Sequence, residues 1–281
     1  MSIEQQRPDP ARSFGGVAEA YDRGRPHYPR EAAVWLTSDQ PLSVLELGAG
    51  TGKLTEQLVA LGHDVHATEP DPKMLALLEK KLPDVRVSQS PAEEIPAGDA
   101  SYDVVVSAQA FHWFDLEQAL PEITRVLKPR GRLSLVWNQR DERIPWVRRL
   151  GRIIGNQDQL RHPTEQLEES RLFGEIDEAS FKFWQGVDKS SIQDLVRSRS
   201  NVAVLAGHEQ EAKLAEVLAF YNDFGRGMDG MQLPYTASCF RAQVLDRVTP
   251  TLTEHRSTDG DSPDGVVSDG TSTDMLLIDF R

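Results

Sequence analysis

The stretch that decides the fold is Ser43-Val-Leu-Glu-Leu-Gly-Ala-Gly-Thr-Gly-Lys53. It opens with a short apolar run that stops at a glycine, which is typical of a buried strand in a parallel sheet. Glycines stand at 48, 50 and 52, where the backbone can turn sharply and approach a ligand because no Cβ is in the way. In open α/β sheets the crevice beyond such a strand is the usual ligand site. The stretch therefore predicts a strand, a ligand-binding turn and a helix.

The same strand and helix pattern repeats downstream of this turn. Leucines at 54, 58 and 61 share one helix face, and Asp71-Pro72 supplies an N-cap and a first-turn proline for another helix. Strands are predicted at 43–47, 64–68, 85–87, 102–107 and 132–137, and a third helix over 116–127 stops at Lys128-Pro129-Arg130-Gly131. Such alternation predicts a doubly wound α/β fold, with a parallel sheet and helices on both faces.

The flanking regions have weaker patterns. After residue 140 we predict helices near 143–155, 189–199 and 208–224, and strands at about 178–187 and 232–241. Before the sheet, 11–24 is predicted as a helix interrupted by Gly15-Gly16, and 30–38 as a helix that opens after Pro29.

The end of the chain differs in composition from the rest. From Thr251 onward there are one Glu, six Asp and two Arg, and between 257 and 274 only Val266 and Val267 are large apolar residues. A segment this polar buries too little apolar surface to offset its ordering entropy. We expect 251–281 to be a disordered acidic tail, and its apolar end Met275–Ile278 to be loosely held rather than docked on a partner.

Composition excludes several classes of protein. The 281 residues carry a net charge of -13, which disfavours binding to nucleic acid or anionic lipid. The lone Cys239 cannot form an internal disulfide, no stretch approaches the length of a membrane span, and the chain start has no apolar signal region. His162 and His208 have no partners at metal-ligand spacing. We expect a cytoplasmic protein with no metal, no nucleic acid and no membrane partner.

The spacing of the glycines bears on which ligand binds. A dinucleotide fingerprint needs a third glycine three positions after Gly50, and Lys53 stands there instead. This argues against NAD or FAD. Glu69, 19 positions after Gly50 at the end of the second predicted strand, can accept both hydroxyls of a ribose. Lys53 and Glu69 together predict a ligand that contains a nucleoside but is not NAD or FAD.

These residues resemble a known family. Val44-Leu-Glu-Leu-Gly-Ala-Gly-Thr-Gly52 resembles the first motif of class I S-adenosylmethionine-dependent methyltransferases, and further similarity lies in 92–96, 103–114 and 127–131. The segment Phe14…Ala18…Tyr21…Arg25-Pro26…Tyr28-Pro29 is similar to that of trans-aconitate-methyltransferase-like and related small-molecule methyltransferases. The resemblance spans roughly residues 10–241. It implies a Rossmann-like, mostly parallel seven-stranded sheet with an antiparallel last strand, under an N-terminal helical cap (1–40) and within a methyltransferase domain (41–250) whose substrate-side helices lie at 140–230.

The resemblance also implies S-adenosyl-L-methionine as the cofactor and assigns its contacts. Gly48 and Gly50 would line the methionine part, with Glu46 near its ammonium, and Glu69 would hold the ribose. The other implied contacts are Ala92 and Glu93 at the adenine, Ser107 and Gln109 beside the sulfonium, and Tyr21 and Arg25 closing over the cofactor, where Arg25 could pair with a carboxylate.

Methyl transfer needs few catalytic residues, because in-line displacement from a sulfonium depends mainly on alignment. A carboxylate acceptor requires no base, whereas a hydroxyl, an amine or an acidic carbon would benefit from one. His112 is the best base candidate, although we favour His112-Trp113-Phe114 as an aromatic wall. Trp137, Trp146 and Trp184 can line an acceptor pocket or pack in the core, and Arg140, Arg143, Arg148 and Arg149 can attract an anion or face solvent.

The function expected from the sequence is transfer of a methyl group to a small-molecule acceptor. Two alternatives stay open, a non-catalytic S-adenosylmethionine-binding or scaffold protein and, less favoured because of Lys53, an NAD(P)-dependent oxidoreductase. The oligomeric state is open between monomer and homodimer.

Overall fold

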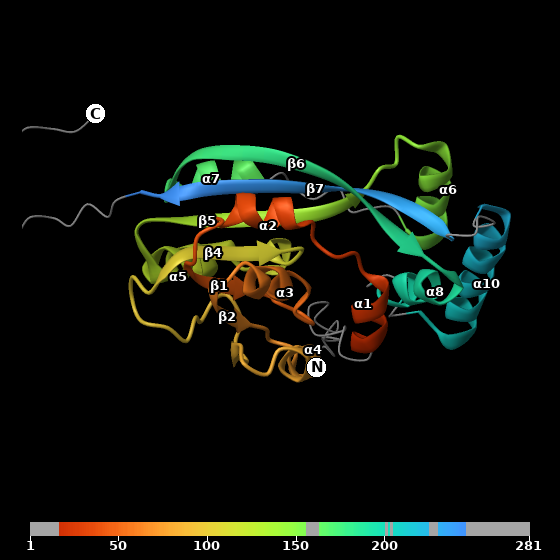
Figure 1. Ribbon diagram of the computed structural model, residues 1–281, viewed down its shortest axis with the longest axis horizontal. Helices are drawn as coiled ribbons and strands as arrows, with labels where there is room; N and C mark the ends of the chain where they lie inside the picture. Colours follow the sequence, from red (N-terminus) through yellow and green to blue (C-terminus); the bar gives the residue numbers. More distant parts are fainter. Residues whose placement is uncertain (1–16, 156–162, 200–201, 203–204, 225–229, 246–281) are drawn as a thin grey trace, which may run out of the picture. The chain divides into compact units, whose positions relative to one another are not determined.

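The computed structural model describes residues 17–155, 163–199, 202, 205–224 and 230–245 (Figure 1). Three features discussed above lie outside the described residues, namely the predicted tail at 251–281, the predicted helix break at Gly15-Gly16, and His162. His208 lies within them.

The sheet has seven strands in the order β3-β2-β1-β4-β5-β7-β6. Neighbours among β1 to β5 are parallel, and β7 is antiparallel to both β5 and β6. The strands are β1 Ser43–Leu47, β2 Asp64–Thr68, β3 Arg86–Ser88, β4 Tyr102–Ala108, β5 Leu127–Arg140, β6 Phe173–Val187 and β7 Met231–Val244. The predicted fold class, with an antiparallel last strand, is confirmed.

Ten described helices connect or flank these strands. They are α1 Ala18–Gly24, α2 Arg30–Leu36, α3 Lys53–Ala60, α4 Pro72–Lys81, the short 3-10 helix η2 Phe111–Trp113, α5 Leu116–Val126, α6 Pro145–Ile154, α7 Pro163–Ser170, α8 Lys189–Arg197 and α10 Gly207–Phe224. Asp71 caps α4 as predicted, because its carboxylate accepts from the backbone N–H groups of Lys73 and Met74. The sequence did not indicate α7 or η2.

The helix predicted over 116–127 is α5, which ends at Val126. The residues expected to stop it, Lys128–Gly131, lie within β5, which begins at Leu127 and not at 132 as predicted. The register between β4 and β5 shifts between Tyr102 and Val104, and Arg130 has a φ of +64°. A bulge therefore carries the proline and the basic residues within the strand. Lys128 also bonds the carboxylate of Asp103 at 3.0 Å, which fixes the bulge to β4.

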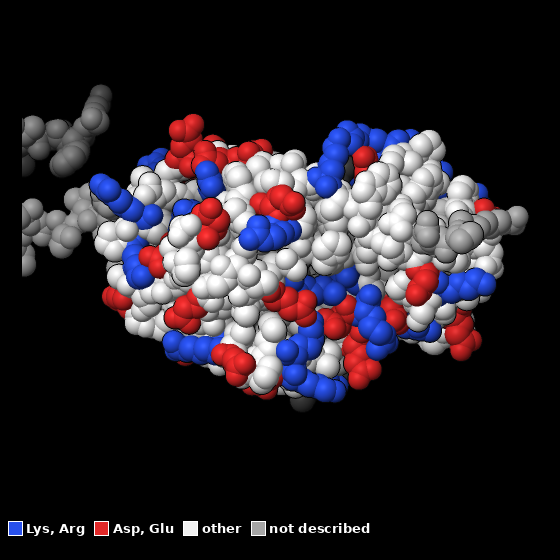
Figure 2. Space-filling view, viewed as in Figure 1, with Lys and Arg blue, Asp and Glu red and all other residues white. Residues whose placement is uncertain are grey.

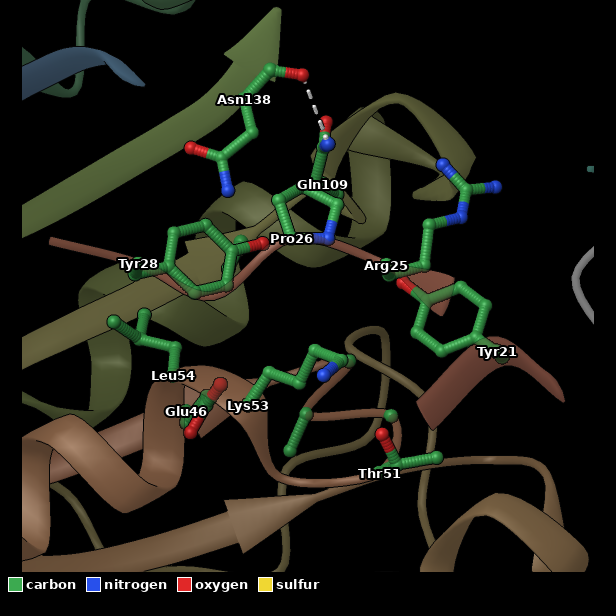
Figure 3. Close-up of a pocket in the computed structure, with 14 residues that line it drawn as sticks. Tyr21, Arg25, Pro26, Tyr28, Glu46, Thr51, Lys53, Leu54, Gln109 and Asn138 are labelled. Carbon is green, nitrogen blue, oxygen red and sulfur yellow. Dashed lines mark hydrogen bonds between the residues drawn. The ribbon is translucent and has the colours of Figure 1, made fainter. Parts of the chain in front are cut away.

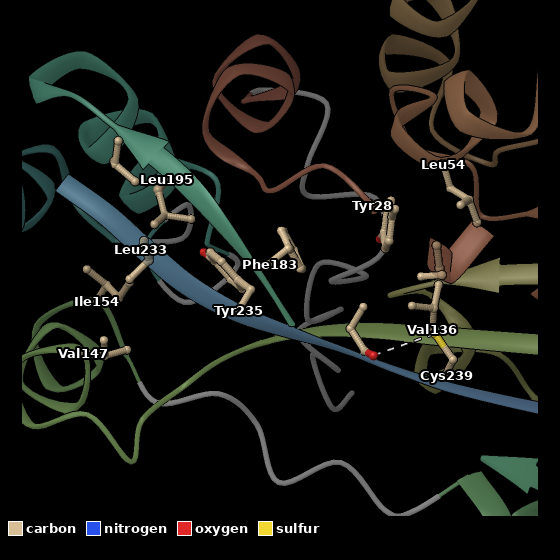
Figure 4. Packing of buried hydrophobic residues seen from close by; sticks show 14 of the residues in the cluster. Tyr28, Leu54, Val136, Val147, Ile154, Phe183, Leu195, Leu233, Tyr235 and Cys239 are labelled. Carbon is tan, nitrogen blue, oxygen red and sulfur yellow. Dashed lines mark hydrogen bonds between the residues drawn. The ribbon is translucent and has the colours of Figure 1, made fainter. Parts of the chain in front are cut away.

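The two faces of the sheet bury two separate cores. Successive residues of β1 alternate between them, since Val44 belongs to one and Leu45 to the other. The first core contains residues of α2, α3, α6, α8 and α10 (Figure 4), and the second contains residues of α5 and α7. Cys239 of β7 lies fully buried in the first core. Helices thus cover both faces, as predicted.

The helices α1, α6, α8 and α10 gather beyond the end of the sheet toward which β4 and β6 point (Figure 1). Within the described part of α1, Arg23 forms an ion pair with Asp194 of α8, with 2.7 Å between Nε and Oδ2. This arrangement places α1 and the segment 25–28 that follows it beside the carboxyl ends of the central strands.

On the face shown in Figure 2, lysine and arginine side chains are interspersed with acidic ones. Of the helices among the described residues, none is long and apolar enough to cross a membrane.

Candidate active site

The turn between β1 and α3 is held in a backbone conformation that favours glycine. Gly48, Gly50 and Gly52 have φ values of +67°, +59° and +84°. A Cβ added at Gly48 would lie 2.5 Å from the Cβ of Ala110, and one at Gly52 would lie 2.9 Å from Cγ of Leu78. At Gly50 the nearest atoms would be 3.8 Å away or more. Close packing thus explains two of the glycines, whereas a Cβ at Gly50 would make only ordinary contacts with Met74 and Tyr21.

Gly50 lines a pocket whose volume is about 390 Å³ when the part open to solvent is included (Figure 3). Six of the predicted site residues line it, namely Tyr21, Arg25, Glu46, Gly48, Gly50 and Gln109. The other lining residues are Pro26, Tyr28, Ala49, Thr51, Lys53, Leu54, Ala108 and Asn138. The structure therefore brings α1, the segment 25–28, the glycine turn and the ends of β4 and β5 to one site.

Glu46 is the most deeply buried acid of the pocket, with 1% of its surface exposed. The hydroxyl of Thr55 donates to its Oε2 at 2.6 Å. Burial, opposed by that hydrogen bond and assisted by the nearby charge of Glu69, raises the pKa of Glu46 to about 8. A cation that entered the pocket would favour the ionised carboxylate.

Glu69 supports the turn from β2. Its Oε2 accepts the N–H of Gly50 at 2.8 Å, and its Oε1 accepts the N–H of Asp71 at 2.9 Å. Burial raises the pKa of Glu69, while the two backbone hydrogen bonds lower it. The carboxylate therefore faces the glycine turn, although it is not among the residues that line the pocket, and its ribose role stays a prediction.

The residues predicted at the adenine lie farther along the same sheet edge. Ala92 is buried in the second core, and Glu93 accepts the N–H of Asp115, the N-cap of α5, at 2.7 Å. Arg125 of α5 donates to the carbonyl oxygens of Ile95 and Ala97. The loop is thus fixed to α5. Neither Ala92 nor Glu93 lines the pocket, and their contact with adenine stays a prediction.

Ser107 and Gln109 occupy the end of β4 in different ways. Ser107 is fully buried, and its hydroxyl has no hydrogen-bond partner among the described residues. Gln109 lines the pocket with a φ of +58°, which is uncommon for a residue with a side chain. Its Nε2 donates to the carbonyl of Asn138 at 3.3 Å. Backbone strain of this kind costs about 1–3 kcal/mol and occurs mostly at functional sites.

Arg25 is held away from the middle of the pocket. Its Nε donates to the hydroxyl of Ser198 at 3.0 Å, and Nη2 donates to the Ser198 carbonyl at 2.8 Å. The guanidinium lies over the ring of Tyr21, 5.1 Å from its centroid. Figure 3 shows it directed away from Glu46 and Lys53. Arg25 thus joins the segment 25–28 to the end of α8.

His112 is not among the residues that line the pocket. It lies in η2 with its ring 4.7 Å from that of Trp113. Its roles as a base or as part of an aromatic wall stay predictions. Of the tryptophans, Trp137 is buried in the second core and Trp184 is 59% exposed. Arg148 and Arg149 are exposed on α6.

Sequence reasoning gave no individual role to four polar residues that line the pocket, Tyr28, Thr51, Lys53 and Asn138. Tyr28 is buried, and Figure 3 shows its hydroxyl directed toward the middle of the pocket. Asn138 donates through Nδ2 to the carbonyl of His27 at 3.0 Å, and its buried Oδ1 has no partner among the described residues. Lys53 served only to exclude a dinucleotide. Tyr28 lay within the quoted N-terminal motif and Asn138 at the end of a predicted strand, so both carried a positional signal.

No group of His, Cys, Asp or Glu side chains in the described parts of the chain could hold a metal ion.

Comparisons with known proteins agree with this architecture. Residues 45–135 match the family described as "Methyltransferase domain". The chain is 43% identical over 241 residues to an uncharacterized methyltransferase of Mycobacterium tuberculosis, covering 85% of this chain and 98% of that protein. A Schizosaccharomyces pombe protein named as methyltransferase-like is 34% identical, covering 79% of this chain and 92% of its own length.

A solved structure shows the same fold. Phosphoethanolamine N-methyltransferase 2 of Haemonchus contortus, in complex with S-adenosyl-L-methionine, superposes with a TM-score of 0.51 at 16% identity, covering 84% of this chain and 60% of that one. Together with the glycine turn, its supporting acids and the strand order, the relatives establish that the chain belongs to the family of class I S-adenosylmethionine-dependent methyltransferases.

Proposed function

We propose that the protein transfers a methyl group from S-adenosyl-L-methionine to a small-molecule acceptor in the pocket of Figure 3. The observation that carries the proposal is the enclosure of one pocket by two kinds of wall. The glycine turn and Glu46 form one, and the segment 25–28 with Gln109 and Asn138 forms the other. The cover that the segment 25–28 provides over the pocket favours a small acceptor over a macromolecule.

The residues present fit the cofactor. The open side of Gly50 admits a ligand close to the backbone, and buried Glu46 offers a carboxyl to an ammonium. Each oxygen of Glu69 accepts one backbone N–H and keeps a further lone pair for a ribose hydroxyl. The proposal retains Ala92 and Glu93 at the adenine, Ser107 and Gln109 beside the sulfonium, and Tyr21 as cover.

Bound S-adenosylmethionine supplies a methyl group on a strongly electrophilic sulfonium. What the protein adds is alignment of an acceptor with that group for in-line displacement, and positioning of this kind contributes roughly 7–11 kcal/mol to lowering a barrier. Gln109 directly follows β4, Asn138 lies near the end of the neighbouring β5, and a hydrogen bond joins the two residues. Because this bond restrains them, they can hold an acceptor in a fixed orientation. The proposal assigns no general base, because His112 does not line the pocket.

The acidic composition and the single buried Cys239 support a cytoplasmic enzyme that acts on small molecules rather than nucleic acid.

Calorimetry of the full chain with S-adenosylhomocysteine tests cofactor binding. We expect saturable heat and a raised melting temperature, and no fluorescence change with NADH or NADPH. Absence of heat and of a thermal shift at millimolar ligand would contradict the proposal. Mass spectrometry of cell extract incubated with enzyme and isotopically labelled cofactor then tests transfer, with a mass gain of one methyl group expected. Binding without any product across a broad acceptor panel would instead identify a non-catalytic binding protein.

A further inference from the structure

The first-core face of the sheet carries a buried tyrosine whose hydroxyl has no hydrogen-bond partner among the described residues. This residue is Tyr235 of β7, which is 3% exposed. Its ring stacks on that of Phe183 of β6, with the ring centroids 5.5 Å apart. Figure 4 shows the hydroxyl turned away from Tyr28, on the side of Leu195 of α8. Because a buried hydroxyl without a partner costs free energy, a partner from outside the chain would stabilise it.

Arg140 is the register partner of Tyr235 across β5 and β7. Directly opposed residues of an antiparallel pair project from the same face, with Cβ atoms about 4.5–5.5 Å apart. The Arg140 side chain is 2% exposed, and Nη2 donates to Oε1 of Glu142 at 3.1 Å and to the carbonyl of Gly155 at 3.2 Å. The other arginines predicted to attract an anion or face solvent are exposed, namely Arg143, Arg148 and Arg149. Of these four arginines, only Arg140 is buried beside a polar group in need of a partner.

Two more arginines approach the same hydroxyl from the helical side. Arg25 directly follows α1, and Arg199 lies two residues after α8. Arg25 bonds the hydroxyl and the carbonyl of Ser198, which are both neutral oxygen atoms. Burial raises the pKa of Tyr235, and the charge of Arg140 opposes this rise most strongly, followed by the charges of Arg25 and Arg199. Three cations from separate segments therefore act on one buried hydroxyl, and we call the four residues the Tyr235 cluster.

The Tyr235 cluster and the pocket of Figure 3 share Arg25, which lines the pocket. Asn138 also lines the pocket, and it stands two residues before Arg140 on the same face of β5. Two residues of a strand span about 7 Å. A small molecule can therefore place one end in the pocket beside Asn138 and the other end at the Tyr235 cluster.

We propose that the methyl acceptor carries an oxyanion, a carboxylate or a phosphate monoester, and that the Tyr235 cluster binds this group while the atom to be methylated lies in the pocket. The inference rests on the proposed function and names the class of its acceptor. The phenol can donate a hydrogen bond to an oxyanion, and guanidinium groups bind carboxylate and phosphate alike. The oxyanion is an anchor about 7 Å beyond Asn138 and is not itself the group that receives the methyl.

The charge of the acceptor is tested on the small-molecule filtrate of cell extract. The filtrate is passed over an anion exchanger at neutral pH and low salt, and each fraction is assayed with the full-length enzyme and S-adenosylmethionine labelled in its methyl group. We expect the acceptor in the salt eluate. Carbodiimide amidation of the eluate should abolish its activity if the anchor is a carboxylate, and phosphatase should do so if it is a phosphate monoester. Acceptor activity in the flow-through, or activity that survives both treatments, overturns the inference.

Tyr235→Phe tests where the oxyanion binds. The change removes a hydroxyl that has no partner among the described residues, so the melting temperature should not fall. The KM for the eluted acceptor is expected to rise about 10-fold, the effect of one charge-assisted hydrogen bond. The kcat should stay unchanged, because the anchor binds the ground state and the transition state alike. The affinity for S-adenosylhomocysteine, measured by calorimetry, should stay within about twofold.

Tyr102→Phe is the matched control. Tyr102 is 6% exposed at the start of β4, and its hydroxyl lies 2.6 Å from Nδ1 of His66. Because this variant loses a buried hydrogen bond, it should melt at a lower temperature and keep the wild-type KM. An unchanged KM in Tyr235→Phe overturns the inference. So does a loss of affinity for S-adenosylhomocysteine that matches the rise in KM, since the change would then disturb the whole site.

Failure of the function and failure of the inference give different results. If the wild type does not bind S-adenosylhomocysteine and no fraction accepts the label, the proposed function fails and the inference with it. If label is transferred to an acceptor that the anion exchanger does not retain, the proposed function stands and only the inference fails.

Discussion

The two walls of the pocket are built from the chain in different ways. One wall comes from a single run of residues, 46–54, whose geometry is fixed by steric limits on the glycine turn. The other is assembled from Tyr21 to Tyr28, Gln109 and Asn138, which meet only in the folded protein. The contiguous wall suits the cofactor that all members of the family share. The assembled wall includes Tyr21 and Gln109, which we propose contact the cofactor, but its other residues can change one by one, and there acceptor choice can vary.

Gly48→Ala should have the largest effect on the contiguous wall, and it should act on folding. The new Cβ would lie 2.5 Å from the Cβ of Ala110 on a backbone with φ of +67°, so overpacking adds to left-handed strain. We expect about 3 kcal/mol lower free energy of unfolding, measured by urea denaturation. Gly62→Ala is the reference, because its φ is +85° with nothing within 4 Å. It should cost only about 1 kcal/mol. Equal losses in both variants would contradict the packing argument.

Buried Glu46 should make the protein without ligand less stable as pH rises. Its pKa is about 8 in the folded chain and near 4.5 when exposed, so between these values the folded state binds more protons than the unfolded state. The contribution is therefore full at low pH and is lost toward pH 8, by about 1 kcal/mol per pH unit.

Urea denaturation of the wild type and of Glu46→Gln between pH 5 and 8 measures this dependence. The Glu46→Gln variant should show a flatter profile, because the amide does not titrate. Parallel profiles for the two proteins would show that Glu46 does not titrate as its burial requires.

Gly50→Ala should damage binding rather than folding. A Cβ at Gly50 contacts nothing closer than 3.8 Å and faces the pocket. Its folding cost should match that of Gly62→Ala, about 1 kcal/mol, while affinity for S-adenosylhomocysteine falls by about 2 kcal/mol, roughly 30-fold. Calorimetry on both variants makes the comparison. If Gly50→Ala bound S-adenosylhomocysteine with unchanged affinity, the ligand would not lie beside Gly50.

Ser198→Ala should have the smallest effect and should act on the assembled wall alone. The change removes the hydroxyl that accepts from Nε of Arg25 but keeps the backbone acceptor. We expect a loss of about 1 kcal/mol in stability and a change in kcat/KM for the acceptor, with the affinity for S-adenosylhomocysteine within about twofold. A larger loss of cofactor affinity than of acceptor efficiency would show that this contact belongs to the cofactor wall instead.

Most of the sheet could be predicted because its signals are local. Buried strands such as Ser43–Leu47 are short apolar runs, and the cap at Asp71 acts on its immediate neighbours. The bulge at Lys128–Gly131 could not be predicted, because Pro and Gly stop a helix far more often than they bend a strand. β6 was predicted too short, since Glu175 and Asp177 on its exposed side hide the strand pattern.

The residues of the site likewise divide into those that a local motif predicts and those that only the folded structure identifies. The positions of Glu46, Gly48 and Gly50 follow from one motif, and the structure places them in the pocket wall. Asn138 received no individual role, because that role depends on which neighbours leave its polar atoms without partners. That information is available only from the tertiary structure. The direction of Arg25 likewise depends on Ser198, which lies 173 residues away.

The buried thiol of Cys239 can be used to detect local opening of the folded structure. It is the only cysteine in the sequence, it lies in β7 between β5 and β6, and burial raises the pKa of its thiol to about 12. A thiol reagent can therefore react only after the first core has opened around Cys239. Timed alkylation of the unmodified enzyme would measure the rate of this opening, and a bound ligand that slows the labelling would show that it stabilises the core that Cys239 shares with Tyr28 and Leu54 of the pocket.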